Sequence, residues 1–426
     1  MLLGFSSKNF KSFPSFSFSM LAAPKQKGLD YSVSDIKIGK ISHKVLSSSV
    51  IYGPNAAGKS TIICAIDLLG KIVSRGHIHD ASLLNVGNFA ESLLALVPNN
   101  RLKRPAPVEL SADFVENGKR YVYSISIDVG AFMDSAYPRK IVEEKLIVNG
   151  VEIFHRNGDS VSVSVSNDDA LFSKEIQKNP DYAKSLVKEG LKKEELFLCN
   201  GFKNIYGQKI FPDIFNFFNG KLLTFCNSQD MRYTPTFAGK GVFSDAEITA
   251  AAKAFGSDVN DLIFIKSKDE MEPLLCSRTE LGKVIPAKFV ESLGTIRFIT
   301  LFPAIVKALQ TGATLVIDEF DNSIHPMAVM SLVNVFHNDD LNKKRAQLIF
   351  NTQNPIYLNN NLFRRDEIKF VDRDENGSSL YSLSDFGTRG TSARKGKNYM
   401  ENYFVDKYGA IKNIDFSELF EKILEG

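Results

Sequence analysis

The stretch VIYGPNAAGKSTI, residues 50–62, decides the fold. From Gly53 to Ser60 it matches the pattern G-x-x-x-x-G-K-[ST] without a mismatch. The β-rich run KVLSSSVIYG precedes the pattern, and STIICAIDLLGKIV, which follows Lys59, is apolar at helical spacing. A strand, a glycine-rich turn and a helix in this order are the setting in which the pattern forms a phosphate-binding loop. The alternative, an ordinary glycine-rich turn, does not account for the full match.

The residue types of this loop suit phosphate binding. Glycines let the backbone come close to phosphate oxygens, and the loop N–H groups point inward. We expect Lys59 to reach the β- and γ-phosphates as a catalytic residue and the Ser60 hydroxyl to ligate Mg²⁺. The residues predicted to bind the nucleotide in this loop are Gly53, Pro54, Asn55, Ala56, Ala57, Gly58, Lys59, Ser60 and Thr61.

A pair of acidic residues, Asp318 and Glu319, follows the apolar run TLVI. A buried strand here can lie beside the strand before the loop and direct both carboxylates at the nucleotide. Asp318 is then predicted to hold Mg²⁺, and Glu319 to act as the general base on the attacking water. A solvated strand end is the alternative, since adjacent Asp and Glu residues are common.

The composition is that of a globular protein large enough for more than one lobe. Of 426 residues, 44% are hydrophobic and 24% charged, with 33 Phe and no Trp. The net charge of +3 gives no reason by itself to expect a nucleic-acid binder. The four cysteines are far apart in the sequence, which favours reduced structural thiols. Neither a signal peptide nor an uninterrupted apolar run of about 18 residues is evident, so we expect no membrane span and a cytoplasmic location.

A third motif makes the resemblance to a family specific. In ESLGTIRFITLF, residues 291–302, a turn of small residues precedes an apolar helix. The turn resembles the signature motif of ABC-type ATPases, in the form seen in RecF-like and SMC-like heads. In that family the start of this helix points at the γ-phosphate held by a second head, so the resemblance implies nucleotide-binding roles for Ser292, Gly294 and Thr295 and a head-to-head dimer. The alternative is a plain serine N-cap on a buried helix.

Further segments are similar to the same family. NFKSF, from Asn9 to Phe13, resembles its first-strand motif, which implies that Asn9 and Lys11 lie near the nucleotide. DEFDNSIHP resembles the D-loop, which faces the partner head. NTQNPIYL stands where the family has its switch strand, and Gln353 replaces the usual histidine there. Glutamine can bind a γ-phosphate or water but cannot titrate near neutral pH, so slow or switch-like hydrolysis is expected.

The resemblance implies an α/β fold, an ABC-type P-loop NTPase head with a mixed sheet flanked by helices and a helical insertion. Residues 1–165 would form the N-terminal part of the head, with the P-loop and antiparallel strands. Residues 166–280 would form a mainly helical insertion. Residues 281–426 would complete the head with the signature, the Asp-Glu strand, the D-loop and the switch strand.

Over nearly the whole chain the sequence looks like the ATPases of bacterial abortive-infection operons, of the RloA or AbiL type, and more distantly like the ATPase half of OLD-type nucleases. This resemblance implies an ATPase of the AAA family that uses ATP and Mg²⁺, dimerises or forms a higher oligomer, and works in anti-phage defence with a separately encoded TOPRIM (RloB-like) effector. Because only 72 residues follow residue 354 in this sequence, we expect no appended TOPRIM nuclease. Two alternatives stay open: a RecF-like ATPase of DNA repair that binds DNA, and an ATP-gated scaffold that hardly hydrolyses.

Four other features have simpler interpretations than a functional site. DRDENG, residues 372–377, is expected to be an acidic β-turn and not a metal site. His77 and His79 have no third ligand nearby in the sequence. The aromatic run from Phe211 to Phe218 favours helix packing over base stacking. The basic loop with Arg389, Arg394, Lys395 and Lys397 could contact nucleic acid, although a solvated loop is the simpler interpretation.

Overall fold

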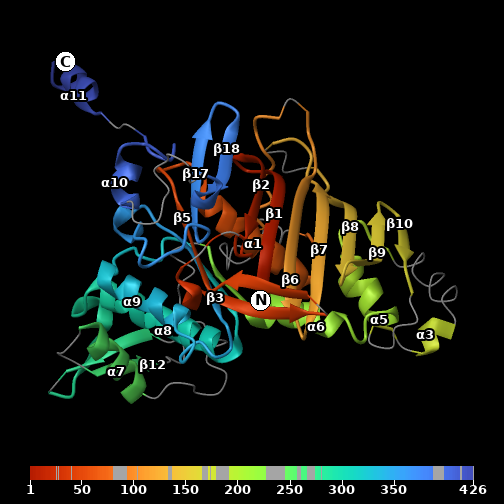
Figure 1. Ribbon diagram of the computed structural model, residues 1–426, viewed down its shortest axis with the longest axis horizontal. Coiled ribbons are helices and arrows are strands. Elements are labelled where there is room, and N and C mark those ends of the chain that lie inside the picture. Colours follow the sequence, from red (N-terminus) through yellow and green to blue (C-terminus); the bar gives the residue numbers. More distant parts are fainter. Residues whose placement is uncertain are drawn as a thin grey trace.

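The computed structural model describes the chain with gaps, and its centre is a helix enclosed by two large sheets (Figure 1). The residues outside the description are 25, 27, 40, 80–93, 103, 133–136, 166–170, 173, 179–190, 227–244, 257–260, 266–273, 280, 387–397, 413–414 and 426. The basic loop of residues 389–397 therefore lies outside the described residues.

The first sheet is antiparallel and has the strand order β10-β9-β8-β7-β6-β1-β2. Its strands are β1 (Leu2–Phe10), β2 (Phe13–Ser19), β6 (Val108–Glu116), β7 (Lys119–Asp128), β8 (Lys140–Val148), β9 (Val151–Asn157) and β10 (Ser160–Val163). Residues along β6 alternate between buried and half-buried, as expected for a sheet with one face on the core. Turns at Asn117-Gly118 and Asn149-Gly150 join neighbouring strands, and all four residues have positive φ, which Asn and Gly tolerate best.

The second sheet is parallel except at one edge and has the order β11-β15-β16-β5-β17-β18. Its strands are β5 (Ser48–Tyr52), β11 (Leu222–Phe225), β15 (Thr314–Ile317), β16 (Gln347–Asn351), β17 (Ile368–Asp374) and β18 (Gly377–Ser382). Every residue of β5, β15 and β16 is buried, as expected of central parallel strands covered on both faces. The predicted α/β fold is therefore confirmed.

Helices cover both faces of the parallel sheet. Helix α1 (Lys59–Arg75) lies between the two sheets and shares one buried cluster with both of them. Helices α8 (Leu293–Thr311) and α9 (Pro326–His337) cover the other face, at the lower left of Figure 1. Within the described residues, α8 is the one helix long and apolar enough to cross a membrane. Half of it is buried here, as in the core helix of a globular protein.

Shorter elements complete the described chain. They are η1 (Asp30–Ser32), β3 (Val33–Ile38), β4 (Ile41–Leu46), α3 (Lys174–Lys178), η2 (Leu198–Phe202), α5 (Lys203–Ile205), α6 (Phe211–Asn216), η3 (Phe217–Lys221), α7 (Asp245–Phe255), β12 (Asp261–Ile265), β13 (Leu274–Arg278), β14 (Val284–Pro286), η5 (Ala287–Phe289), η6 (Pro355–Tyr357), η7 (Leu383–Asp385), α10 (Tyr399–Phe404) and α11 (Ser417–Glu425).

The segment 166–280, expected to be mainly helical, also contains strands. Strand β11 pairs in parallel with β15, and β12 and β13 belong to a small antiparallel sheet with β14. Residues 222–225 directly follow an aromatic helical run, and they become a strand because the edge of β15 offers them backbone partners. Tertiary context overrides the local pattern here. The boundaries of the three predicted parts stay a prediction.

The disulfide between Cys64 and Cys226 corrects the expectation that all four cysteines are reduced. Cys64 lies on α1, and Cys226 directly follows β11. The packing of α1 against β11 brings the Cα atoms of the two cysteines to 5.3 Å from each other, although the cysteines are 162 residues apart in the sequence. Sequence spacing alone does not reveal such a pair. Neither Cys199 nor Cys276 takes part in a disulfide in the described chain.

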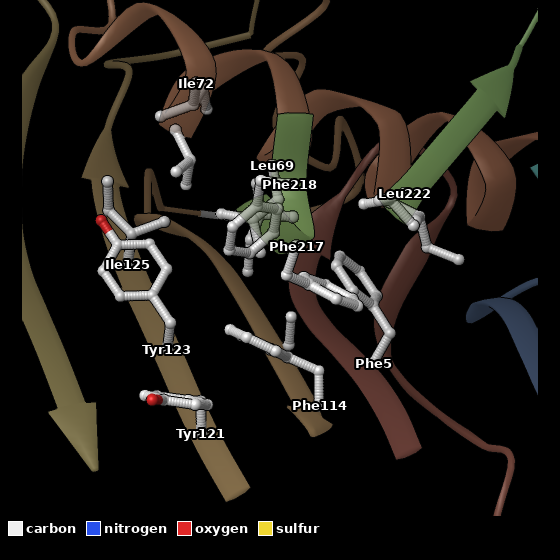
Figure 2. Close-up of a cluster of buried hydrophobic side chains, with 14 of the residues drawn as sticks. Phe5, Leu69, Ile72, Phe114, Tyr121, Tyr123, Ile125, Phe217, Phe218 and Leu222 are labelled. Atoms are coloured by element: carbon white, nitrogen blue, oxygen red, sulfur yellow. The ribbon is translucent and has the colours of Figure 1, made fainter. Parts of the chain in front are cut away.

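The core between α1 and the antiparallel sheet is aromatic. Figure 2 shows Phe114 and Tyr123 of the sheet beside Phe217 and Phe218, with Leu69 of α1 next to them. The rings of Phe114 and Phe217 are stacked with their centroids 4.0 Å apart. The interpretation of the aromatic run as packing is confirmed at its three buried members, Phe211, Phe217 and Phe218.

Replacing Phe217 with Ala should lower the free energy of unfolding by about 3–5 kcal/mol, because the change leaves a cavity in a fully buried aromatic cluster. Denaturant unfolding followed by circular dichroism measures this loss. Phe215 is the matched control, because it lies in the same run but is 40% exposed, so Phe215→Ala should cost far less. Equal losses in the two variants would contradict the assigned packing.

Candidate functional site

The loop from Gly53 to Gly58 joins β5 to α1, and α1 begins at Lys59. Gly58 has a φ of 118°, and a Cβ there would lie 2.8 Å from Ser12 Oγ. A Cβ on Gly53 would lie 2.3 Å from the carbonyl oxygen of Val371. Both glycines are therefore required by close contacts on the outside of the loop. The start of α1 presents free N–H groups and the positive end of the helix dipole, which favour an anion.

The Lys59 ammonium lies inside this loop and donates hydrogen bonds to the carbonyl oxygens of Gly53 and Pro54, at 2.9 and 3.0 Å. Burial lowers the pKa of Lys59, and the nearby carboxylates, led by Asp318, oppose that effect. A cation held among carbonyl oxygens at a helix start can exchange them for phosphate oxygens.

A cavity of about 810 Å³ lies beside the loop and brings together residues from distant parts of the sequence. Its lining residues are Lys11, Ser12, Asn55, Ala56, Gly58, Lys59, Ser60, Thr61, Glu319, Asp321, Asn322, Asn351, Thr352, Gln353, Asn354 and Arg373. Among them are nine of the predicted site residues, including Lys11, Glu319 and Gln353. These nine residues come from the β1–β2 turn, the P-loop, the start of α1, and the segments that follow β15 and β16.

Asp318 is buried and contacts two residues that line this cavity. Its carboxylate accepts hydrogen bonds from the Asn351 amide and the Ser60 hydroxyl. Burial raises the pKa of Asp318, and these two hydrogen bonds oppose the rise. The Ser60 hydroxyl and the Asp318 carboxylate are oxygen donors, the kind that Mg²⁺ prefers, and Mg²⁺ commonly takes its other ligands from phosphates and water. The residues present therefore fit the predicted metal.

Glu319 adopts a left-handed backbone conformation, with a φ of 49°, at the turn after β15. Three contacts hold this turn. The backbone N–H of Glu319 donates to Asn351 Oδ1 at 2.6 Å, the Arg297 guanidinium donates to the Glu319 carbonyl oxygen, and the Thr352 hydroxyl donates to Asp321 at 2.7 Å. A carboxylate on a backbone held in this uncommon conformation, at the wall of the cavity, suits a positioned general base.

Sequence reasoning missed the residues that support these carboxylates. The Asn351 amide contacts both Asp318 and the backbone of Glu319, and it lies at the end of β16, beside β15. Asn351 begins the same stretch NTQNPIYL in which Gln353 is predicted to act, but no pattern in the sequence assigns a role to Asn351. Arg373, on β17, also went unnoticed; it lines the cavity and donates to the Ala56 carbonyl oxygen at 3.1 Å.

Of the two predicted residues of the first-strand motif, Lys11 lies at the cavity and Asn9 does not. Lys11 lines the cavity, and burial lowers its pKa, with the carboxylate of Asp318 opposing that effect. Asn9 does not line the cavity. Its side chain donates to the carbonyl oxygens of Ala106 and Pro107 and accepts from the backbone N–H of Asn99, so it holds the segment between α1 and β6.

The signature residues lie at the start of α8 and do not line the cavity of their own chain. Ser292 caps the helix, because its hydroxyl accepts from the Thr295 backbone N–H at 3.1 Å. A Cβ on Gly294 would lie 2.3 Å from the Ser323 carbonyl oxygen, so the D-loop packs against this position. Ser292 and Leu293 are exposed, with Leu293 at 73%, whereas Gly294 and Thr295 are buried, so the first residues of this helix start face outward.

Two other candidates have structural roles in the described chain. Asp374 Oδ1 accepts from the backbone N–H groups of Asn376 and Gly377, so DRDENG is the predicted turn, here between β17 and β18. His79 approaches Glu194, and His77 forms a β-bridge with Glu195. Among the described residues there is no cluster of three or more His, Cys, Asp or Glu that could hold a metal.

Comparison with known proteins places the chain in a family. Residues 48–159 and 252–359, together just over half of the chain, match the AAA_21 family, described as "AAA domain, putative AbiEii toxin, Type IV TA system". The chain belongs to this family of P-loop ATPases. No curated protein shows significant similarity to it.

Among solved structures, the chain is similar to heads of SMC proteins. One is the SMC head bound to the C-terminal winged-helix domain of ScpA, at 13% identity and a TM-score of 0.40 over 89% of this chain and 97% of that one. Another is the SMC head domain from Thermotoga maritima, at 12% identity and a TM-score of 0.38 over 89% of this chain and 98% of that one. A third is the SMC head with an extended coiled coil, bound to the C-terminal domain of ScpA derived from Pyrococcus furiosus. It shows 12% identity and a TM-score of 0.39 over 89% of this chain and 96% of that one.

Replacing Asn351 with Ala should slow ATP hydrolysis by about 10–100-fold, because Asp318 loses a donor and the Glu319 N–H loses its acceptor. Nucleotide binding should change much less, because the P-loop is intact. Phosphate release and the affinity for a fluorescent ATP analogue separate the two effects. The matched control is Asn361→Ala on the exposed surface, and an unchanged hydrolysis rate in Asn351→Ala would contradict the positioning role.

Proposed function

We propose that this chain binds and hydrolyses Mg-ATP at the cavity beside the P-loop. The observation that carries the proposal is the convergence of Lys59, Ser60 and the Asp318-Glu319 pair from different elements on one place. This combination of a helix start, a cation, oxygen donors for Mg²⁺ and a positioned carboxylate is what phosphoryl transfer to water needs.

Each residue has a role in this proposal. Lys59 exchanges its loop carbonyls for phosphate oxygens, and the loop N–H groups hold the remaining oxygens. Ser60 and Asp318 hold Mg²⁺, which when bound neutralises phosphate charge. Glu319 accepts the proton of the attacking water, and Gln353, which lines the same cavity, orients that water or the γ-phosphate. Lys11 adds a second positive charge near the phosphates.

We further propose that the active site is completed by a second copy of the chain. Ser292, Gly294 and Thr295 lie outside the cavity of their own chain, and the N-terminus of α8 faces outward. Two exposed apolar residues, Leu293 and Met327, lie at this helix start and beside the D-loop. A second chain placed head to head would supply its α8 N-terminus to the γ-phosphate and cover these residues.

The biological role proposed here is that of a cytoplasmic ATP-driven regulator of a separate effector in anti-phage defence. The family description supports a link to toxin systems, since it names an AbiEii toxin of a type IV toxin–antitoxin system. The resemblance to RloA- or AbiL-type ATPases supports a TOPRIM-like effector. A slowly hydrolysing ATP-gated scaffold is the second candidate, and Gln353 in the cavity in place of a histidine is the observation that favours it.

Complementation tests the shared site. Lys59→Ala and Ser292→Arg should each be inactive. An equimolar mixture should regain phosphate release, up to about a quarter of the wild-type rate if the chains pair at random, because one site per mixed dimer is intact. Light scattering with Mg-ATP, using Glu319→Gln to retain ATP, should show the dimer.

The matched control is a mixture of Lys59→Ala with Glu319→Gln, which leaves no intact site and should stay inactive. A shared site is ruled out if the first mixture also stays inactive while light scattering shows mixed dimers. Dimers without phosphate release in the wild type would favour the scaffold.

The raised pKa of Asp318 predicts a pH dependence of metal binding. Mg²⁺ requires the carboxylate, so the affinity for Mg-ATP should fall as the pH decreases from about 7.5 to about 5, more steeply in wild type than in Asp318→Asn. The stability of the metal-free protein should change with pH in the opposite direction. The folded pKa lies above the unfolded value, so the contribution of Asp318 to stability decreases as the pH rises through it. Titration calorimetry at several pH values measures the affinity, and parallel profiles for both proteins would contradict the assignment.

A further inference from the structure

Helix α11 carries an apolar face with no cover in the described chain. Phe416, which precedes it, and Leu419, Phe420, Ile423 and Leu424 recur at helical spacing, and each side chain is between 52% and 81% exposed. Figure 1 shows α11 projecting away from the two sheets. Five large apolar side chains on nine helical residues and their neighbour form a contiguous patch, and such a patch marks an interaction surface.

The charge of this segment limits what can cover it. The sequence DFSELFEKILE contains four acidic residues and one lysine. A second α11 would bring like charges together, so pairing of two such helices is unfavourable. An acidic helix also disfavours anionic lipid. The surface that fits is apolar and positively charged.

A surface of this kind exists on the chain itself, around β14 and η5. Its apolar members are Leu281, Val284, Phe289 and Val290, with Leu281 87% and Phe289 71% exposed. The exposed cations among them are Lys283 and Lys288, and the Lys288 ammonium lies 5.2 Å from the centre of the Phe289 ring. Arg278, at the end of β13, pairs across the strands with the exposed Asp261, so the positive charge of this surface comes from the two lysines. We call this set the β14 surface.

The helix and the β14 surface of one chain lie far apart. In Figure 1, α11 is at the upper left and the small sheet that contains β12 is at the lower left, with α8, α9 and α10 between them. A projected separation is a lower bound on the true one, so α11 cannot cover the β14 surface of its own chain in this arrangement.

We propose that α11 of one chain docks on the β14 surface of a second copy, and that the contact is reciprocal. Two such contacts close a dimer with twofold symmetry. Reciprocity matters because a single short helix covers less than the about 800 Å² per partner that a standard interface buries. The contact needs no nucleotide, so it goes beyond the ATP-dependent dimer proposed above. The β14 surface ends at Val290, two residues before Ser292, which places this contact next to the helix start that the ATP site needs.

The test is the molar mass of the full chain by sedimentation velocity without nucleotide and with EDTA. Wild type should be a dimer that weakens with added salt. Asp415→Lys just before the helix with Glu421→Lys on it, Lys283→Glu with Lys288→Glu on the β14 surface, and the apolar change Ile423→Asp should each weaken it by about 10-fold or more. Combining the helix and surface charge reversals should restore most of the lost affinity. Lys343→Glu, at an exposed position elsewhere, is the matched control and should change nothing.

Three outcomes would overturn the proposal: a monomeric wild type, a dimer that Ile423→Asp leaves unchanged, or a dimer that depends on α11 but not on Lys283 and Lys288. If the monomeric wild type binds neutral phosphatidylcholine vesicles and Ile423→Asp abolishes that binding, α11 is a lipid-binding helix instead. Failure of the ATP site is distinguishable, because Ile423→Asp combined with Glu319→Gln should still dimerise with Mg-ATP.

Discussion

The register of three parallel strands is the constraint on which the site depends. Phe350 of β16 pairs with Ile317 on one side and with Val50 on the other, so the ends of β15, β16 and β5 lie at one edge of the sheet. The Asp-Glu pair, Asn351 and the P-loop all begin at that edge. A slip of one residue would turn each side chain to the other face of the sheet and break the contacts of Asn351.

The charges around this edge largely balance within the protein. The carboxylates of Asp318, Glu319 and Asp321 stabilise the buried Lys59 and the half-buried Arg297 in their charged forms, although burial lowers the pKa of both. Removing only the carboxylates or only the cations would leave an uncompensated charge inside the protein. The cost of such a charge exceeds the stabilisation that the ion pair provides. The same groups therefore contribute to the stability of the fold and to the properties of the site.

Much of the fold and of the site could be predicted, because local patterns determine them. The P-loop, the strand before Asp318, the hairpins at Asn-Gly and the apolar helix after Ser292 each follow from residue type and spacing. Asn351 could not be predicted, because its role depends on which strand lies next to β15. Strand β11 and the Cys64–Cys226 bond depend in the same way on packing between distant segments. The role of Ser292 depends on a second chain, which a local pattern indicates only through resemblance.

The Cys64–Cys226 bond also has a topological consequence. It closes a covalent ring that begins on α1, returns after β11, and contains all of β6, β7, β8, β9 and β10. Most strands of the antiparallel sheet are thus part of this covalent ring, whereas β1 and β2 belong to the chain outside it. A single peptide bond cut anywhere inside the ring would leave one covalently continuous molecule, with the P-loop and the Asp-Glu strand still tethered to each other.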